Sequence, residues 1–196
     1  MNMDAKATLG IAAGVISISG FIPYIASILK KKTKPNRATW WIWTLVGGVL
    51  FAGYVASGNW SSAWVPLSYV LGPLLVSLLA LRHGEGGWEP FDRKCLLSSF
   101  VGLLLWGILG TPLLAMIINI GVDLAGALPT MRKTYKNPAS ENKTAWVLFF
   151  MGTAINCLAV RSWSEPSAIL PLYFCAMTAI MMALCFRRIP ARGSLL

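Results

Sequence analysis

The chain has 196 residues, of which 56% are hydrophobic and 12% are charged, and its formal net charge is +10. An ordinary soluble domain carries about 25% charged residues, so this composition argues against a soluble globular domain and favours a polytopic membrane protein. A basic balance can also indicate nucleic-acid binding, but here the basic residues flank apolar runs, where anionic lipid headgroups attract them. We therefore expect no nucleic-acid partner.

Seven apolar runs follow one another along the chain, each near the roughly 20 residues that a helix needs to cross a bilayer. They are Thr8–Leu29, Thr39–Ser57, Ala63–Leu81, Cys95–Gly110, Pro112–Met131, Thr144–Val160 and Pro166–Phe186. Only Gly110-Thr111-Pro112 separates the fourth run from the fifth, and this glycine and proline punctuation favours two helices over one long helix. The sequence therefore predicts an all-α polytopic membrane protein with seven transmembrane helices.

The basic residues indicate how these helices cross the membrane. With seven spans, 15 of the 17 Lys and Arg residues lie on one face, and only Lys6 and Arg161 lie on the other. By the positive-inside rule, the N-terminus is then outside and the C-terminus is cytoplasmic. We expect a multi-pass protein of the plasma (cell inner) membrane. The first run is longer than the roughly 7–15 residues of a signal-peptide core, so we expect no cleavable signal.

The chain contains two copies of one unit. GFIPYIASILKKKTKPNRATWWIW, from Gly20 to Trp43, returns as GALPTMRKTYKNPASENKTAWVLF, from Gly126 to Phe149, with a glycine, a proline, an asparagine and a tryptophan matched at a spacing of 106. The copies predict two three-helix repeats, residues 1–82 and 112–196, joined by the cytoplasmic loop and linker helix of residues 83–111. Because one connector helix separates them, the repeats are parallel and related by an axis along the membrane normal.

Pro23 and Pro129 occupy matching positions near the cytoplasmic end of the first helix of each unit. A proline inside a helix removes a backbone donor and kinks or loosens the helix. Each proline is therefore a candidate hinge, with a static kink as the alternative. The tryptophans after the first basic loop, Trp40, Trp41 and Trp43, are expected to form a belt at the cytoplasmic interface.

Asp123 is the one formal charge predicted well inside a span. Such a charge costs at least a few kcal/mol and usually serves a function. Asn119 lies four residues earlier on the same helical face, and Asn156 lies in the sixth span, so we expect a central polar patch. The patch could bind a cationic or hydroxyl-bearing solute or carry a coupling proton. Alternatively, Asp123 is protonated and only bonds a neighbouring helix. Ser17 occupies the matching position in the first unit, so the halves are chemically unequal.

The sequence holds no catalytic or metal-binding pattern. Its four cysteines form no CxxC pair, its single histidine, His83, follows a helix in a charged loop, and Walker and GxSxG motifs are missing from the sequence. We expect no enzymatic activity, no metal and no cofactor.

The arrangement resembles the SWEET/PQ-loop superfamily of membrane transporters over essentially the whole chain. The features that carry the resemblance are two three-helix units around one linker helix, and a proline followed by a basic loop in each unit. The family's Pro-Gln pair stands here as Pro23-Tyr24 and Pro129-Thr130. The resemblance implies alternating access between the two units, with the prolines as hinges.

The resemblance therefore implies a small-solute transporter for a polar or cationic metabolite or a sugar. Sugar-carrying relatives often have a tryptophan in the second helix of each unit, where this chain has Phe51 and Cys157. We count both among the residues that line the gap between the halves. The alternative is a non-transporting receptor or scaffold on the same fold. The expected partners are a small solute and the lipid bilayer, and a homo-oligomer remains open.

Overall fold

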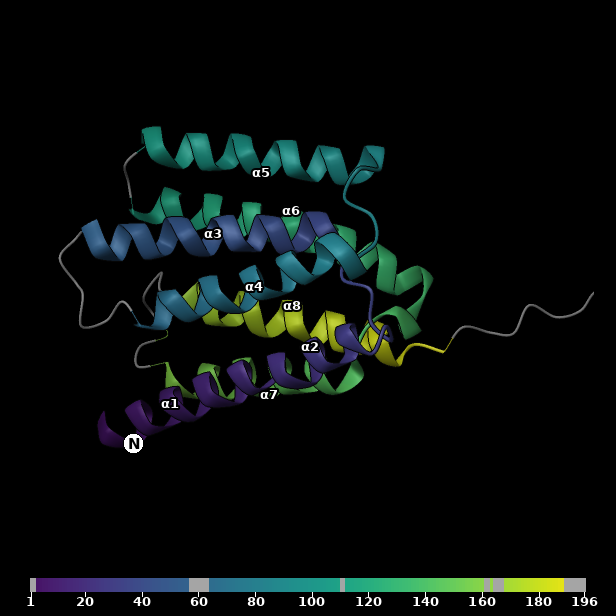
Figure 1. The fold of residues 1–196 in the computed structure, drawn as a ribbon. Helices are drawn as coiled ribbons and strands as arrows, with labels where there is room; N and C mark the ends of the chain where they lie inside the picture. Colours follow the sequence, from purple (N-terminus) through teal and green to yellow (C-terminus); the bar gives the residue numbers. More distant parts are fainter. Residues whose placement is uncertain (1–2, 57–63, 110–111, 161–162, 164–167, 189–196) are drawn as a thin grey trace, which may run out of the picture.

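The computed structural model describes residues 3–56, 64–109, 112–160, 163 and 168–188, and in these ranges every regular element is helical (Figure 1). The elements are α1 (Met3–Ser19), α2 (Phe21–Leu29), α3 (Arg37–Ala56), α4 (Trp64–His83), α5 (Pro90–Leu109), α6 (Pro112–Lys136), the 3-10 helix η2 (Pro138–Ser140), α7 (Lys143–Ala159) and α8 (Ile169–Phe186). The prediction of an all-α chain is confirmed for these residues. The predicted span ends Ser57, Ala63, Gly110 and Pro166 lie outside the described residues.

Two of the described helical segments are long and apolar enough to cross a membrane. They are Ala5–Leu29, which α1 and α2 form together, and Ile169–Phe186, which is α8. Tyr69–His83 and Lys143–Ala159 are shorter apolar helices. These lengths support a membrane protein to that extent, and the other five spans stay predictions.

The two repeated prolines have different local structures. The first predicted span is broken at Gly20, and Pro23 lies in the first turn of α2, where a backbone N–H would have no partner within the helix. Pro129 instead lies inside α6, a single helix of 25 residues. One proline therefore follows a break and the other lies within an unbroken helix. Their role as hinges stays a prediction.

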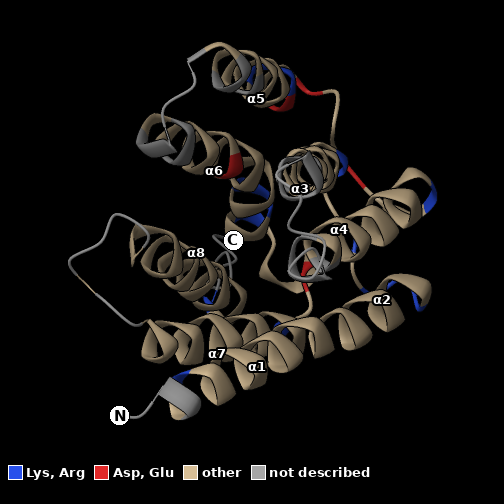
Figure 2. Cartoon of the chain, turned by 90° about the vertical axis from the view of Figure 1, so that its left-hand side faces the viewer, with Lys and Arg blue, Asp and Glu red and all other residues tan. Residues whose placement is uncertain are grey.

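The helices of the two halves are arranged alike (Figure 2). In the first half α4 contacts both α2 and α3, and in the second half α8 contacts both α6 and α7. The third helix of each unit therefore lies between the first and the second. The predicted linker helix, α5, packs along α6 and also contacts α3.

The halves meet through two reciprocal helix pairs. The first helix of each unit packs along the second helix of the other, as α1 on α7 and as α6 on α3. Side chains follow the same pattern: a Cβ on Gly20 would lie 2.7 Å from the Phe149 ring, and a Cβ on Gly126 would lie 2.6 Å from Ile42 and 3.4 Å from Trp43. A two-fold axis produces such reciprocity. The repeated glycine lets the helices approach closely.

The repeated asparagine caps a helix in each half. The Asn36 side chain accepts the backbone N–H of Thr39 at 3.2 Å, and the Asn142 side chain accepts that of Ala145 at 2.8 Å. A side-chain acceptor at this position satisfies a backbone donor that the first turn leaves unpaired. The asparagines therefore mark where the second helix of each unit starts.

The predicted tryptophan belt is wrong for Trp40, which lies in the core. Trp40 is 1% exposed, and the rings of Tyr24 and Trp43 each lie 5.1 Å from it between centroids. Trp43 is partly buried and points its indole N–H at α6. Gly126 leaves room for Trp43, and Gly20 leaves room for Phe149, so aromatic rings fill the contact between the halves.

Candidate functional site

Asp123 lies near the middle of α6 and is 6% exposed. Its Oδ2 accepts a hydrogen bond from the Tyr173 hydroxyl of α8 at 2.7 Å. The backbone carbonyl of Asp123 accepts one from the Trp43 indole N–H of α3 at 3.3 Å. Helices from both halves therefore meet at this residue.

Aromatic side chains lie in the region of the Asp123 carboxyl group. Tyr69 of α4 lies within electrostatic range of Asp123. The Tyr69 ring stacks on Phe174 with 6.3 Å between centroids and 22° between planes, and Phe174 lies 5.3 Å from Tyr173. An aromatic face attracts a cation, and a carboxylate provides the countercharge. This combination is suited to a positively charged group.

The structure joins only part of the predicted polar patch. Asn119 lies one turn before Asp123 in α6, and Asn156 lies in α7; both are partly buried. Within the described part of the chain, the side-chain hydrogen bond of Asp123 goes to Tyr173 and to neither asparagine. Sequence reasoning missed Tyr173, because no spacing rule connects a residue in the last helix with one fifty positions earlier.

The remaining predicted site residues lie on other contacts. Ser17 faces α7, where a Cβ on Gly152 would meet its hydroxyl. The Cys157 thiol donates to the Pro171 carbonyl of α8 at 3.4 Å, inside the second half. Phe51 is partly buried in α3. None of the three is among the side chains that the structure places at Asp123.

The residue after Pro129 fixes α6 to the first half. The Thr130 backbone N–H and hydroxyl both donate to Thr39 Oγ1 of α3, at 3.2 and 2.9 Å. Both threonines are fully buried. Any movement about Pro129 would therefore have to break or carry along this contact between the halves.

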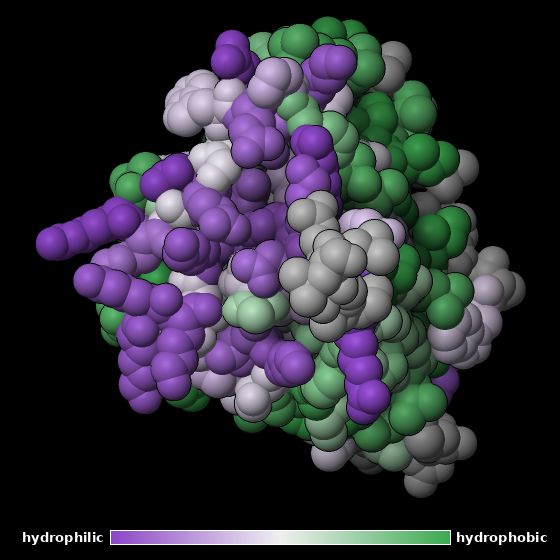
Figure 3. Space-filling view, turned by 90° about the vertical axis from the view of Figure 1, so that its right-hand side faces the viewer, coloured by the Kyte–Doolittle hydropathy of each residue, from purple (hydrophilic) through white to green (hydrophobic). Residues whose placement is uncertain are grey.

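A second buried carboxyl group, Glu141, lies in the basic loop between α6 and α7. Figure 3 shows the hydrophilic side chains gathered on one face of the molecule. Its Oε2 accepts the Trp146 indole N–H at 2.9 Å, and its Oε1 pairs with the Lys133 ammonium. Lys133 also donates to the Lys34 carbonyl, and the Lys34 N–H donates to the Ser140 carbonyl at 3.1 Å. We call these five residues the Glu141 cluster. It ties the first basic loop to the second half.

Two unpaired donors lie beside this cluster. The Tyr24 hydroxyl and the Trp40 indole nitrogen are buried and make no hydrogen bond, and Tyr24 lies within electrostatic range of Glu141. A buried donor without a partner is costly. The Tyr24 hydroxyl is therefore a further donor near the Glu141 carboxylate. No pattern in the sequence predicts the burial of Glu141, since an acidic residue in a basic loop is usually solvated.

Comparisons with protein-family models, with curated proteins and with solved structures find no match for this chain. The family resemblance stays a prediction from the sequence. Among the described residues, no group of three or more His, Cys, Asp and Glu side chains could hold a metal ion.

Proposed function

We propose that the chain is a small-solute transporter of the SWEET/PQ-loop type. In this proposal it has seven membrane spans and an outside N-terminus, and its two halves alternate access to a site at Asp123. The observation that carries the proposal is the burial of Asp123 where helices of both halves meet. An ionisable side chain inside a span is costly and is usually kept for a substrate, a proton or a partner.

The distribution of polar and apolar side chains supports membrane burial. Ile11, Ile22 and Ile108 are 70%, 72% and 76% exposed, while Thr39 and Thr130 are fully buried. Soluble monomers rarely expose contiguous apolar patches larger than a few hundred Å². Lipid would cover the apolar flanks, and the hydrophilic end seen in Figure 3 would face the cytoplasm under the positive-inside rule.

The surroundings of Asp123 favour a cationic solute over a neutral one. The Asp123 carboxylate accepts from the Tyr173 hydroxyl, and its backbone carbonyl accepts from the Trp43 indole, so a countercharge and aromatic groups lie together there. A neutral sugar would leave a buried carboxylate without a countercharge. We therefore propose an organic cation, such as a primary amine or a quaternary ammonium compound, as the substrate class.

The Glu141 cluster represents the closed cytoplasmic end in this mechanism. Lys133 and Lys34 connect the halves there, so opening toward the cytoplasm would require Lys133 to leave the Lys34 carbonyl. The unpaired Tyr24 hydroxyl could then donate to Glu141. A solute can shift such an equilibrium only by binding one state more tightly than the other.

The test is uptake into proteoliposomes of a panel of organic cations and neutral sugars, with wild type beside Asp123→Asn. Glu89→Gln is the control, because it also removes one carboxylate charge but Glu89 is exposed and lies just before α5. Loss of a hydrogen-bonded charge should lower cation uptake about ten-fold or more. If no solute moves and none stabilises the protein, the transporter proposal fails and the receptor or scaffold reading replaces it. If uptake occurs but Asp123→Asn leaves its rate and pH dependence unchanged, the Asp123 site alone is wrong.

A further inference from the structure

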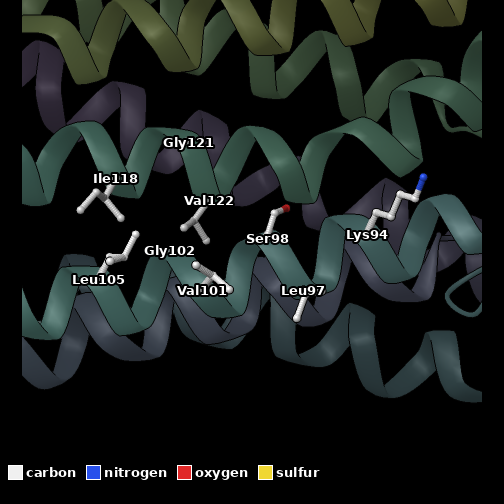
Figure 4. A pocket seen from close by; sticks show the side chains of 9 residues that line it. All are labelled: Lys94, Leu97, Ser98, Val101, Gly102, Leu105, Ile118, Gly121 and Val122. Atoms are coloured by element: carbon white, nitrogen blue, oxygen red, sulfur yellow. The ribbon is translucent and has the colours of Figure 1, made fainter.

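A groove of about 570 Å³ runs between α5 and α6 on the outside of the helix bundle. Figure 4 shows Lys94 at one end of it and Leu105 and Ile118 at the other. Apart from Lys94 and Ser98, the residues that line it are apolar or glycine. The groove is therefore an apolar surface groove with a lysine at one end.

Two glycines make the groove. Gly102 of α5 packs directly on Val122 of α6, and an added Cβ there would collide with the valine. A Cβ on Gly121 would meet no atom within 4 Å. The helices therefore touch along the floor at Gly102, while the space above Gly121 stays open. A side chain at position 121 would enter the groove without displacing protein atoms.

The length of the groove matches one leaflet of a bilayer. Lys94 and Leu105 are eleven residues apart in α5, which corresponds to about 16 Å along a helix. The hydrocarbon core of a bilayer is about 30 Å thick, so one leaflet supplies about 15 Å. An extended acyl chain could lie along the groove from the membrane surface to the bilayer centre.

The cation lies at the end where a lipid headgroup would be. Lys94 is exposed and makes no hydrogen bond or ion pair within the described residues. At the same end, the Arg132 guanidinium lies 4.7 Å over the Phe91 ring and 4.0 Å from Glu89. Under the proposed orientation this end faces the cytoplasmic leaflet, whose anionic lipids attract basic side chains.

We propose that the α5–α6 groove binds an anionic phospholipid. One acyl chain lies over Gly121, and the headgroup phosphate pairs with Lys94. This inference rests on the membrane placement and orientation proposed above, but it needs neither transport nor the Asp123 site. Lipid binding and uptake can therefore fail independently.

Native mass spectrometry of the detergent-purified full chain tests the proposal, with phosphatidylglycerol and phosphatidylcholine added at equal concentration. The variants are Lys94→Gln, which removes the cation, and Gly121→Leu, which fills the groove. Their controls are Lys30→Gln, an exposed lysine at the end of α2, and Gly14→Leu, at an exposed glycine of α1 with no atom within 4 Å of an added Cβ. The controls repeat each change of charge or volume away from α5.

Wild type should retain phosphatidylglycerol in preference to phosphatidylcholine. Lys94→Gln should lower phosphatidylglycerol binding about five-fold, the effect of one basic residue at a membrane surface. Gly121→Leu should lower the binding of both lipids, and the two controls should behave as wild type. Equal retention of both lipids by wild type, or an unchanged Lys94→Gln, would overturn the proposal. A dimer that Gly121→Leu dissociates would also overturn it, because a second copy would then occupy the groove.

Discussion

At Asp123 the protein holds a carboxyl group away from solvent with one side-chain donor, the Tyr173 hydroxyl. An ionised carboxylate has about four lone-pair sites, so a single donor leaves most of them unused. Such a group becomes better satisfied when it takes up a proton or when a cationic ligand arrives. The incomplete set of partners therefore agrees better with a binding role than with a purely structural bond.

The first prediction concerns the stability that the Tyr173 hydroxyl provides. Tyr173→Phe removes the donor and leaves the buried Asp123 oxygen without its partner. The free energy of unfolding should fall by about 1–3 kcal/mol, as for other buried acceptors that lose a donor. Thermal unfolding in detergent measures the change. Tyr135→Phe is the control, because Tyr135 is 58% exposed. Equal unfolding midpoints for the two variants would contradict the prediction.

Among the individual residues of the site, the sequence predicted Asp123 but neither Tyr173 nor Glu141. Asp123 could be found because a charge inside an apolar run stands out without any knowledge of the fold. Tyr173 and Glu141 could not, because a tyrosine in an apolar helix and a glutamate in a polar loop are both ordinary. Only the packing of α8 on α6 brings Tyr173 to Asp123, and only the fold of the second half brings Lys133 and Trp146 to Glu141.

Among the elements, the repeated glycine determines how closely the halves approach. Gly126 of α6 faces Ile42 and Trp43 of α3, just as Gly20 faces Phe149 of α7. The sequence predicted the repeat from its spacing of 106 residues. The predicted spans end within about five residues of the observed helices, but the break of the first span at Gly20 was missed. It could not predict which helices pair, because the crossing of α1 with α7 depends on side chains that lie far apart in the chain.

The second prediction tests this close approach. In Gly126→Ala the new methyl group would lie 2.6 Å from Ile42, which is 1% exposed and has little room to move. Overpacking of this kind should lower the free energy of unfolding by about 1–3 kcal/mol. Gly14→Ala is the matched control: no atom lies within 4 Å of its added Cβ, and a helical alanine should stabilise by up to about 1 kcal/mol. Denaturant titration in micelles measures both. Equal shifts in the same direction would contradict the prediction.

In the molecule as a whole, the helix packing repeats in the two halves, whereas the buried acidic residues do not. The reciprocal pairs α1–α7 and α3–α6 follow a two-fold axis, and the asparagine caps repeat. Asp123 has Ser17 as its counterpart, and Pro35 occupies the position that matches Glu141. Asp123 and Glu141 therefore both belong to the second half, whereas a third buried acid, Asp92, lies in α5. If the halves move against one another, the reciprocal helix pairs are the contacts along which they move. Asp123 and Glu141 of the second half are then the charged groups that the motion affects.

The third prediction concerns the contact between the halves at the end of the molecule that the proposed orientation places in the cytoplasm. Cys185 of α8 is fully buried and lies within electrostatic range of Glu141 and Lys133, so its thiol can report whether the Glu141 cluster has opened. Glu141→Gln removes the carboxylate that positions the Lys133 ammonium, and Lys133 is the side chain that bonds the Lys34 carbonyl of the first half. Loss of such a charged hydrogen bond should favour the open state about ten-fold.

The measurement is the rate at which a maleimide labels Cys185 in a chain whose other three cysteines, Cys95, Cys157 and Cys175, are alanine. Glu141→Gln should be labelled about ten-fold faster than its parent. When opening and closing are fast relative to labelling, the rate follows the population of the open state. Glu89→Gln removes a carboxylate from a surface pair 4.0 Å long and should leave the rate unchanged. If both variants label at the parental rate, the Glu141 cluster does not hold the two halves together at this end. The alternating mechanism would then need a different cytoplasmic contact, although the Asp123 site would be unaffected.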